Sequence, residues 1–180
     1  MKDVCTISRG KAYTKSYIKE HKGEYPLYSS QTLNNGELGK INTYDYDGEY
    51  VTWTTDGIYA GTTFYRKGKF SITTHCGILN SNNSNLLLNK FLYFLLSTNR
   101  IKNIDKNQTI PMFTTTLMEQ IEIPIPSLEV QQKIVNILDK LENYSKDIKT
   151  GLPLEIEQRQ KQYEYYRNML LDFEKFRGGI

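Results

Sequence analysis

The order of apolar and polar positions divides the chain into two regions with different periods. Over residues 1–126, short runs rich in Tyr, Thr, Ile and Val alternate with glycines, a pattern typical of strands and turns. The runs at 50–54, 62–65 and 70–74 predict strands, and Lys67-Gly68 before the last run predicts the return of a hairpin. The first region therefore reads as a strand-rich domain.

Other local signals complete this first region. Apolar residues without turn formers predict a buried helix over 89–100, packed against the sheet. A second short helix is expected over 114–121, followed by a closing strand over 121–125. Turns are expected where Gly follows Asn or Asp, because Gly tolerates positive φ: Asn35-Gly36, Asp47-Gly48 and Asp56-Gly57.

From Ser127 the period becomes that of a helix. Apolar residues recur at alternating spacings of four and three, as in a heptad seam, and Thr150-Gly151-Leu152-Pro153 interrupts this pattern. The helix either kinks at Pro153 or folds back on itself, and the sequence leaves both open. We predict an α+β fold, with a mixed, strand-rich globular domain over 1–126 and a long α-helical coiled-coil arm over 127–177, bent or turned near 150–153.

The apolar seam of the arm must be covered by something. It could pack privately on its own domain, or it could pair with another chain or another copy of this one. Sustained heptads and tyrosines at seam positions favour the second interpretation, since a buried Tyr needs a hydroxyl partner. The predicted interface residues are Val130, Ile134, Ile137, Leu141, Tyr144, Ile156, Tyr163, Tyr166 and Leu170.

Composition and charge narrow the class of protein. The chain has 180 residues, 38% hydrophobic and 24% charged, and no apolar run long enough for a membrane span or a signal peptide, so we expect a cytoplasmic protein. Two isolated cysteines, Cys5 and Cys76, are expected to be reduced core residues. The net charge of +3 belongs to residues 1–126, which hold 14 Lys/Arg against 11 Asp/Glu. This mild excess is a weak sign of a phosphate-facing surface.

Residue types that carry catalysis do not converge in the sequence. His75 beside Cys76 has no second His/Cys pair at a metal-ligand spacing, and adjacent strand residues point to opposite faces, which argues against a nucleophilic pair. Neither G-x-x-x-x-G-K-[ST] nor G-x-G-x-x-G occurs. We therefore predict a protein that is not an enzyme, with no metal and no cofactor of its own.

Loop-borne polar residues instead suggest nucleic-acid binding. Amide groups can make paired contacts to adenine, Arg and Lys can contact guanine, and cations neutralise phosphate. The candidate DNA-binding residues are Lys11, Ser29, Ser30, Gln31, Thr32, Asn34, Thr54, Thr55, Thr63, Arg66, Lys67, Lys102, Lys106, Asn107, Gln108 and Thr109.

The junction between the two regions carries a more specific signal. The stretch from Ile121 to Val135 resembles the specificity subunit of type I restriction–modification systems, in which an I-x-I-P-x-P-x-L-x-x-Q-x-x-I run closes a target-recognition domain and opens a conserved helix. Residues 151–167 resemble the continuation of that region. Residues 23–30, 36–39 and 57–61 resemble its variable domain.

The resemblance implies that two copies of the chain recognise DNA together and that partner subunits carry out catalysis. Such subunits usually hold two recognition domains and two helical regions, whereas this sequence has one of each. Two copies would then associate through their arms, each reading half of a split double-stranded DNA target, and would dock methyltransferase subunits and, through them, the restriction subunit. Catalysis would belong to those partners. A stand-alone DNA-binding regulator, an inactive truncated fragment and an adaptor whose arm binds only protein remain alternatives.

Overall fold

The computed structural model describes residues 1–98, 111–147 and 153–172, with the backbone alone at 145–147 and 153–156. Six strands form one sheet in the order β1-β6-β4-β5-β2-β3, antiparallel throughout except for the β2–β5 pair. The strands are β1 (Cys5–Arg9), β2 (Lys22–Tyr28), β3 (Glu37–Ile41), β4 (Tyr46–Thr54), β5 (Thr63–Ile72) and β6 (Cys76–Ser81). The helices are α1 (Lys15–Glu20), the 3-10 turn η1 (Leu33–Gly36), α2 (Asn89–Leu96), α3 (Thr115–Gln120), α4 (Leu128–Asp147) and α5 (Pro153–Leu170). The strand-rich α+β prediction for the first region is confirmed.

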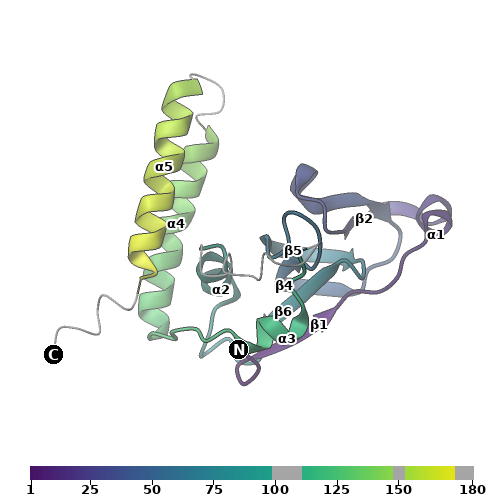
Figure 1. The fold of residues 1–180 in the computed structure, drawn as a ribbon, viewed down its shortest axis with the longest axis horizontal. Coiled ribbons are helices and arrows are strands. Elements are labelled where there is room, and N and C mark those ends of the chain that lie inside the picture. The colour runs from purple at the N-terminus through teal and green to yellow at the C-terminus, as the bar shows by residue number, and fades with distance from the viewer. Residues whose placement is uncertain (99–110, 148–152, 173–180) are drawn as a thin grey trace.

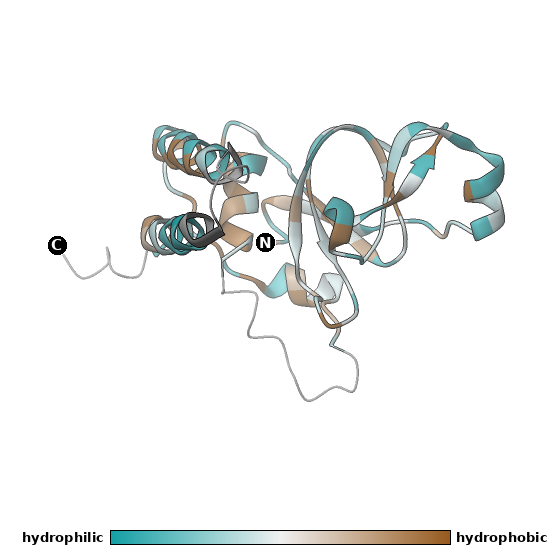
Figure 2. Cartoon of the chain, turned by 90° about the horizontal axis from the view of Figure 1, so that it is seen from above, coloured by the Kyte–Doolittle hydropathy of each residue, from teal (hydrophilic) through white to brown (hydrophobic). Residues whose placement is uncertain are grey.

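The central hairpin of the sheet is longer than the sequence suggested. Gly48 and Gly68 lie opposite each other inside β4 and β5, both with positive φ (134° and 91°). The predicted turn at Asp47-Gly48 and the predicted hairpin return at Lys67-Gly68 are therefore wrong. Glycine inside a strand often marks a bend, and the sheet of this domain is curved (Figure 2). The true turn lies at 55–62, where the predicted Asp56-Gly57 turn is confirmed by a φ of 94° at Gly57.

The two faces of the curved sheet bury different sets of side chains. Because alternate residues of a strand point to opposite faces, β5 sends Phe70 and Ile72 to the inner face, where they meet Cys76 and Ile78 in a small core. The outer face carries Val51, Trp53 and Leu79 into the main core, which α2 covers. The helix α2 therefore lies between the sheet and the arm (Figure 1).

The shorter helices follow their sequence signals with one exception. The predicted helix at 89–100 is confirmed through Leu96, and Arg100 lies outside the described residues. The helix α3 is confirmed, with the Thr114 hydroxyl accepting a hydrogen bond from the backbone N–H of Leu117 at its start. The closing strand expected over 121–125 is wrong, because this segment pairs with no strand in the described part of the chain. Pro124 and Pro126 lack the N–H groups that a ladder requires.

The arm is a helical hairpin. The helices α4 and α5 lie side by side and run in opposite directions (Figures 1 and 2). At 20 and 18 residues they are each roughly 30 Å long at 1.5 Å per residue. Of the two arrangements that the sequence left open, the structure has the reversal. Among the described residues, no helix is long and apolar enough to cross a membrane.

The predicted seam of the arm is divided between two faces. Ile134, Leu138 and Tyr163 are buried in the main core, with Leu141 and Leu170 packed against it, so one stripe of the hairpin covers its own domain. The other seam positions face outward. The exposed fractions are 40% for Val130, 45% for Ile137, 60% for Tyr144 and 38% for Tyr166. Ile156 lies in α5, where its side chain is outside the described residues. One face of the hairpin therefore packs on its own domain, and another face exposes a row of apolar side chains.

Candidate nucleic-acid interface

A three-residue turn between β5 and β6, residues 73–75, gathers loops that are far apart in the sequence. The hydroxyl of Thr73 donates to the Ser29 hydroxyl at 3.0 Å, and Thr73 pairs with Lys11 in an isolated bridge. Thr74 O accepts from the Arg9 guanidinium at 2.9 Å, and His75 O accepts from the backbone N–H of Thr55 at 3.1 Å. We call the surrounding segments the loop cluster: residues 9–11, 29–36, 55–62, 73–75 and 111–113.

Backbone hydrogen bonds hold the β4–β5 turn against the segment that follows the undescribed residues 99–110. The N–H of Gly57 donates to Pro111 O at 3.2 Å, and the N–H of Phe113 donates to Thr55 O at 2.7 Å. The tip of the turn carries Ile58, 87% exposed, beside the exposed Tyr59. The turn therefore exposes apolar side chains at its tip, while hydrogen bonds to residues 111–113 hold its base in place.

The loop at 29–36 presents polar groups from a strained backbone. Asn34 and Asn35 have positive φ (50° and 53°), a region that Asn tolerates better than most residues, and Gly36 continues it. The amide Nε2 of Gln31 donates to Glu37 O, which fixes that side chain across the loop. Gln31 and Asn34 are exposed, whereas Ser29, Ser30 and Thr32 are half-buried. These five predicted residues therefore lie together in the loop cluster.

Lys11 is at the surface but is already paired. Its ammonium lies 2.5 Å from Asp45, which also accepts from the Tyr13 hydroxyl at 2.5 Å. Burial alone would raise the pKa of the Asp45 carboxyl, but hydrogen bonds from Lys11 and Tyr13 outweigh it and lower that pKa. The same hydrogen bond raises the pKa of the Lys11 ammonium. A phosphate that contacts Lys11 must therefore share it with Asp45.

Four of the predicted DNA contacts are buried in this structure. Thr54, Thr55 and Thr63 lie in the interior at the ends of β4 and β5. Arg66 points into the inner face of the sheet because it alternates with the outward Lys67. Its guanidinium stacks on the ring of Tyr28 at 3.5 Å, and its Nε donates to the Thr52 hydroxyl at 3.2 Å. Burial lowers the pKa of this guanidinium.

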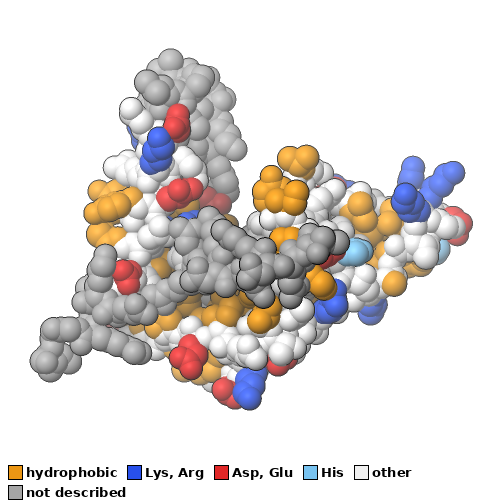
Figure 3. Space-filling view, viewed as in Figure 1, with side chains coloured by type: hydrophobic (Ala, Val, Ile, Leu, Met, Phe, Trp, Pro, Cys, Tyr) orange, Lys and Arg blue, Asp and Glu red, His pale blue; other side chains and the backbone are white. Residues whose placement is uncertain are grey.

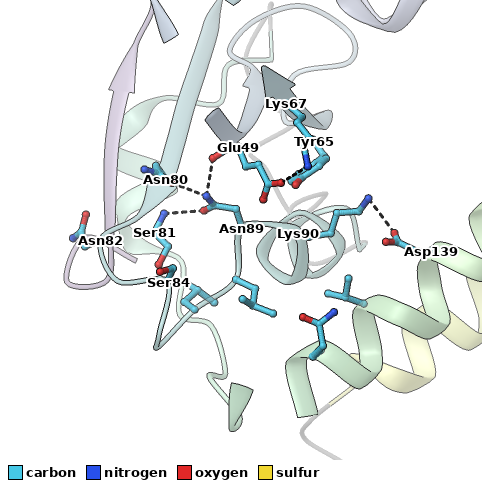
Figure 4. Close-up of a pocket in the computed structure, with 14 residues that line it drawn as sticks. Glu49, Tyr65, Lys67, Asn80, Ser81, Asn82, Ser84, Asn89, Lys90 and Asp139 are labelled. Carbon is cyan, nitrogen blue, oxygen red and sulfur yellow. Dashed lines mark hydrogen bonds and ion pairs between the residues drawn. The ribbon is translucent and has the colours of Figure 1, made fainter. Parts of the chain in front are cut away.

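The remaining predicted residues are separated from the loop cluster or lie outside the description. Lys67 is paired with Glu49 at 2.9 Å and lines a groove between the sheet and the arm (Figure 4). Residues beyond the described part of the chain are Lys102, Lys106, Asn107, Gln108 and Thr109. Their segment ends at Pro111, which is part of the loop cluster.

The structure adds basic side chains that the sequence analysis did not include among the DNA contacts. Arg9 is exposed at the end of β1, and His75, 58% exposed, shares a 2.8 Å contact with Asp56. Lys15 and Lys19 are exposed on α1, and Lys and Arg side chains gather at that end of the molecule (Figure 3). Only the pairing of β1 with β6 brings Arg9 beside the turn, so no local signal could have found it.

The described residues give no sign of catalytic or metal chemistry. Burial raises the pKa of the Cys5 thiol to about 11 and that of Cys76 to about 12, so both stay protonated and unreactive near neutral pH. No group of three His, Cys, Asp or Glu side chains suited to a metal ion occurs in the part of the chain that is described.

Comparison with known proteins points to one family. The profile described as "Type I restriction modification DNA specificity domain" matches residues 1–158. The chain is 44% identical over 173 residues to the type I specificity subunit S.MpnORF285P of Mycoplasma pneumoniae, covering 96% of this chain and 56% of that protein. It is 46% identical over 173 residues to the specificity subunit of the type I restriction enzyme MpnII of the same organism, covering 96% and 52%. The chain thus spans little more than half the length of these relatives.

A solved structure shares the fold. The S subunit of a type I restriction–modification system from M. genitalium superimposes with a TM-score of 0.69 at 17% sequence identity, covering 81% of this chain and 38% of that one. This identity is low, so the likeness shows the arrangement of the elements alone.

Proposed function

The chain belongs to the family of type I restriction–modification DNA specificity domains, and we propose on this basis that it reads one half of a split double-stranded DNA target. The chain holds one recognition domain and one helical hairpin. In this proposal it supplies no catalysis and needs no cofactor. It acts in the cytoplasm, where the target DNA is.

The observation that carries the proposal is the loop cluster. Amides, hydroxyls and cations of residues 9–11 and 29–36 meet at the turn 73–75, and backbone hydrogen bonds brace the neighbouring segments 55–62 and 111–113. Base edges are read by amide and cationic groups, and phosphates are held by cations and hydroxyls. The proposed contacts are Lys11, Ser29, Ser30, Gln31, Thr32 and Asn34, to which we add Arg9 and His75 and, from the preceding segment, Lys102, Lys106, Asn107, Gln108 and Thr109.

Two copies would associate through the outward stripe of the arm. Val130, Ile137 and Tyr144 are seven residues apart, so they form one row along α4, and Tyr166 of α5 is exposed as well. The inward positions Ile134, Leu141 and Tyr163 already pack on the domain, so they would support the arm rather than form the interface. A closed pair of this kind is two-fold symmetric, and its preferred target would be an inverted repeat.

The catalytic partners in this proposal are a type I DNA methyltransferase subunit, which brings S-adenosylmethionine, and through it the restriction subunit. The pair of copies would position these partners over DNA that the loop clusters have selected.

Methylation mapping tests the proposal directly. The full chain is produced with its type I methyltransferase subunit in a host without DNA methylation, and the genome is sequenced with detection of modified bases. We expect one methylated motif that requires the chain. If the methyltransferase modified the same motif without the chain, or no motif with it, the proposed function would be wrong.

Matched variants locate the reading surface. Gln31→Ala and Asn34→Ala remove exposed amides of the loop cluster, and we expect each to lower methylation of the motif by about tenfold, equivalent to one lost base contact. Asn82→Ala removes an exposed amide just beyond the other end of β6 and should leave methylation unchanged. An equal loss in all three variants would assign the effect to folding rather than to DNA reading.

A further inference from the structure

One buried amide lies at the root of the arm. Gln131 is in the first turn of α4 and is completely buried (0% exposed), although its neighbour Gln132 is exposed. A buried amide is costly unless its donors and acceptor are satisfied. This residue is the Gln of the junction motif, and neither the proposed DNA contacts nor the arm interface uses it.

The amide of Gln131 ties three backbone segments together. Its Nε2 donates to Leu86 O and to Pro126 O, both at 2.8 Å. Its Oε1 accepts from the backbone N–H of Leu88 at 2.9 Å. Leu86 and Leu88 belong to the connection between β6 and α2, and Pro126 ends the segment that leads into the arm. Both donor hydrogens and the acceptor are therefore used, and all three bonds join the arm to the recognition domain or to the hinge before it.

An ion pair also joins α2 to α4. Lys90 of α2 contacts Asp139 of α4 at 3.1 Å, about two turns along α4 from Gln131. Between these points a groove of about 650 Å³ separates the sheet from the arm, lined on the arm side by Gln132, Val135 and Asp139 (Figure 4). Apolar packing continues behind the groove, but it is not directional, whereas the hydrogen bonds of Gln131 are.

We propose that Gln131 is a positioning residue that fixes the direction of the arm relative to the recognition domain. Its consequence for DNA rests on the proposed function: if two copies meet through their arms, this direction sets the separation of half-sites that the pair can span. The lever is long. Over the roughly 30 Å of α4, a rotation of about 10° at the root moves the far end by about 5 Å, more than one base-pair step.

A distance measurement tests the clamp without DNA. Spin labels are placed at Asn82→Cys, on the domain, and Gln160→Cys, on α5, two exposed sites, in the full chain. The native Cys5 and Cys76 are buried and remain unlabelled. We expect Gln131→Leu, which removes all three hydrogen bonds, to broaden the distance distribution. Gln132→Leu, an exposed amide whose hydrogen bond stays within α4 to Asn136, should not.

A spacer series then tests the consequence. The full chain is bound to DNA in which the methylated motif carries its natural spacer or one lengthened by two base pairs. We expect wild type to prefer the natural spacer by about tenfold, and Gln131→Leu by less than about threefold, since a stiff link selects geometry and a loose one does not. Affinity for a single half-site should stay within about twofold in every variant. Loss of folded protein would lower all affinities alike and leave their ratio unchanged.

The outcomes separate the two ideas. An unchanged distance distribution in folded Gln131→Leu, or in Gln131→Met if the first variant does not fold, overturns the clamp. A broadened distribution with an unchanged spacer ratio overturns the link to half-site spacing. If wild type binds no split target at all, the proposed function is wrong, and the distance distribution still decides the role of Gln131.

Discussion

At the scale of single residues, steric contact between neighbouring strands decides which residue can occupy position 77 of the sheet. Gly77 of β6 pairs with Trp53 of β4, and a Cβ added at Gly77 would lie 2.0 Å from the indole ring. The same indole donates from Nε1 to Phe113 O at 3.0 Å, so the ring cannot move aside without breaking that bond. Glycine is therefore required here for space, not for an unusual φ.

We predict that Gly77→Ala lowers the free energy of unfolding by about 3 kcal/mol, as overpacking of a rigid core does. Urea denaturation followed by tryptophan fluorescence measures it. Gly39→Ala is the matched control, because its new Cβ would meet only the Ile18 side chain at 3.7 Å, an ordinary contact. Equal losses in the two variants would contradict the steric argument.

Asp45 gives a prediction about pH. Hydrogen bonds from Lys11 and Tyr13 lower the pKa of its carboxyl in the folded state. Its contribution to stability is therefore present above the unfolded value of 3.8 and is lost as pH falls through the lower folded pKa. We expect Asp45→Asn to be less stable than wild type near neutral pH and to lose less stability below about pH 4. Denaturation midpoints of both proteins, measured across that pH range, test this prediction. Midpoints that fall in parallel with pH for the two proteins would refute it.

At the scale of elements, α4 serves two surfaces with one helix. Residues at spacings of three and four, Gln131, Ile134, Val135 and Leu138, face the domain and are buried. Positions seven apart, Val130, Ile137 and Tyr144, remain on the outer side. Because a helix turns 100° per residue, neighbours in sequence can belong to different surfaces.

This separation predicts that association and folding can be disrupted independently. Ile137→Asp places a charge on the outer stripe, so we expect light scattering to show a monomer while circular dichroism shows an unchanged helix content. Leu138→Asp places the same charge in the core, at 0% exposure, and should unfold the protein. Asn136→Asp, exposed and turned about 100° from Ile137, should do neither. A dimer that survives Ile137→Asp would exclude this stripe as the interface.

At the scale of the whole molecule, the recognition domain and the arm share one core. The main core runs from Trp53 of the sheet through Phe91 and Leu95 of α2 to Leu138 of α4 and Tyr163 of α5. Each copy would join its arm to its domain through the same contacts, so a symmetric pair of arms would present a symmetric pair of loop clusters.

The corresponding prediction concerns the form of the methylated motif. With only this chain and its methyltransferase subunit present, we expect the two halves of the motif to be inverted copies of one sequence, separated by a fixed spacer. Modified-base sequencing supplies both features in one measurement. Two unrelated half-sequences would require a second recognition domain and would contradict the symmetric pair.

Local sequence determined most of the secondary structure. The strand-rich region, the helices α2 and α3 and the two helical segments of the arm follow from periodicity, caps and turn residues, which act over a few neighbouring positions. The junction motif from Ile121 to Val135 indicated the family, which the profile match supports.

Tertiary structure alone decided which side of each element is buried. Alternation along β5 was visible, but the sequence did not show which face packs inward. The structure places Arg66 on the face of Phe70 and Ile72, stacked on Tyr28, and Lys67 on the opposite face. Arg9 joined the loop cluster because β1 pairs with β6. Its guanidinium then donates to Thr74 O, 65 residues away in the sequence. The arm could kink or reverse with the same heptads. Gln131 looked like any polar helix residue until the structure paired its amide with Leu86 and Leu88, more than 40 residues away, and with the nearby Pro126. Non-local contacts of this kind leave no pattern in a short stretch of sequence, because their energy depends on which elements meet in space.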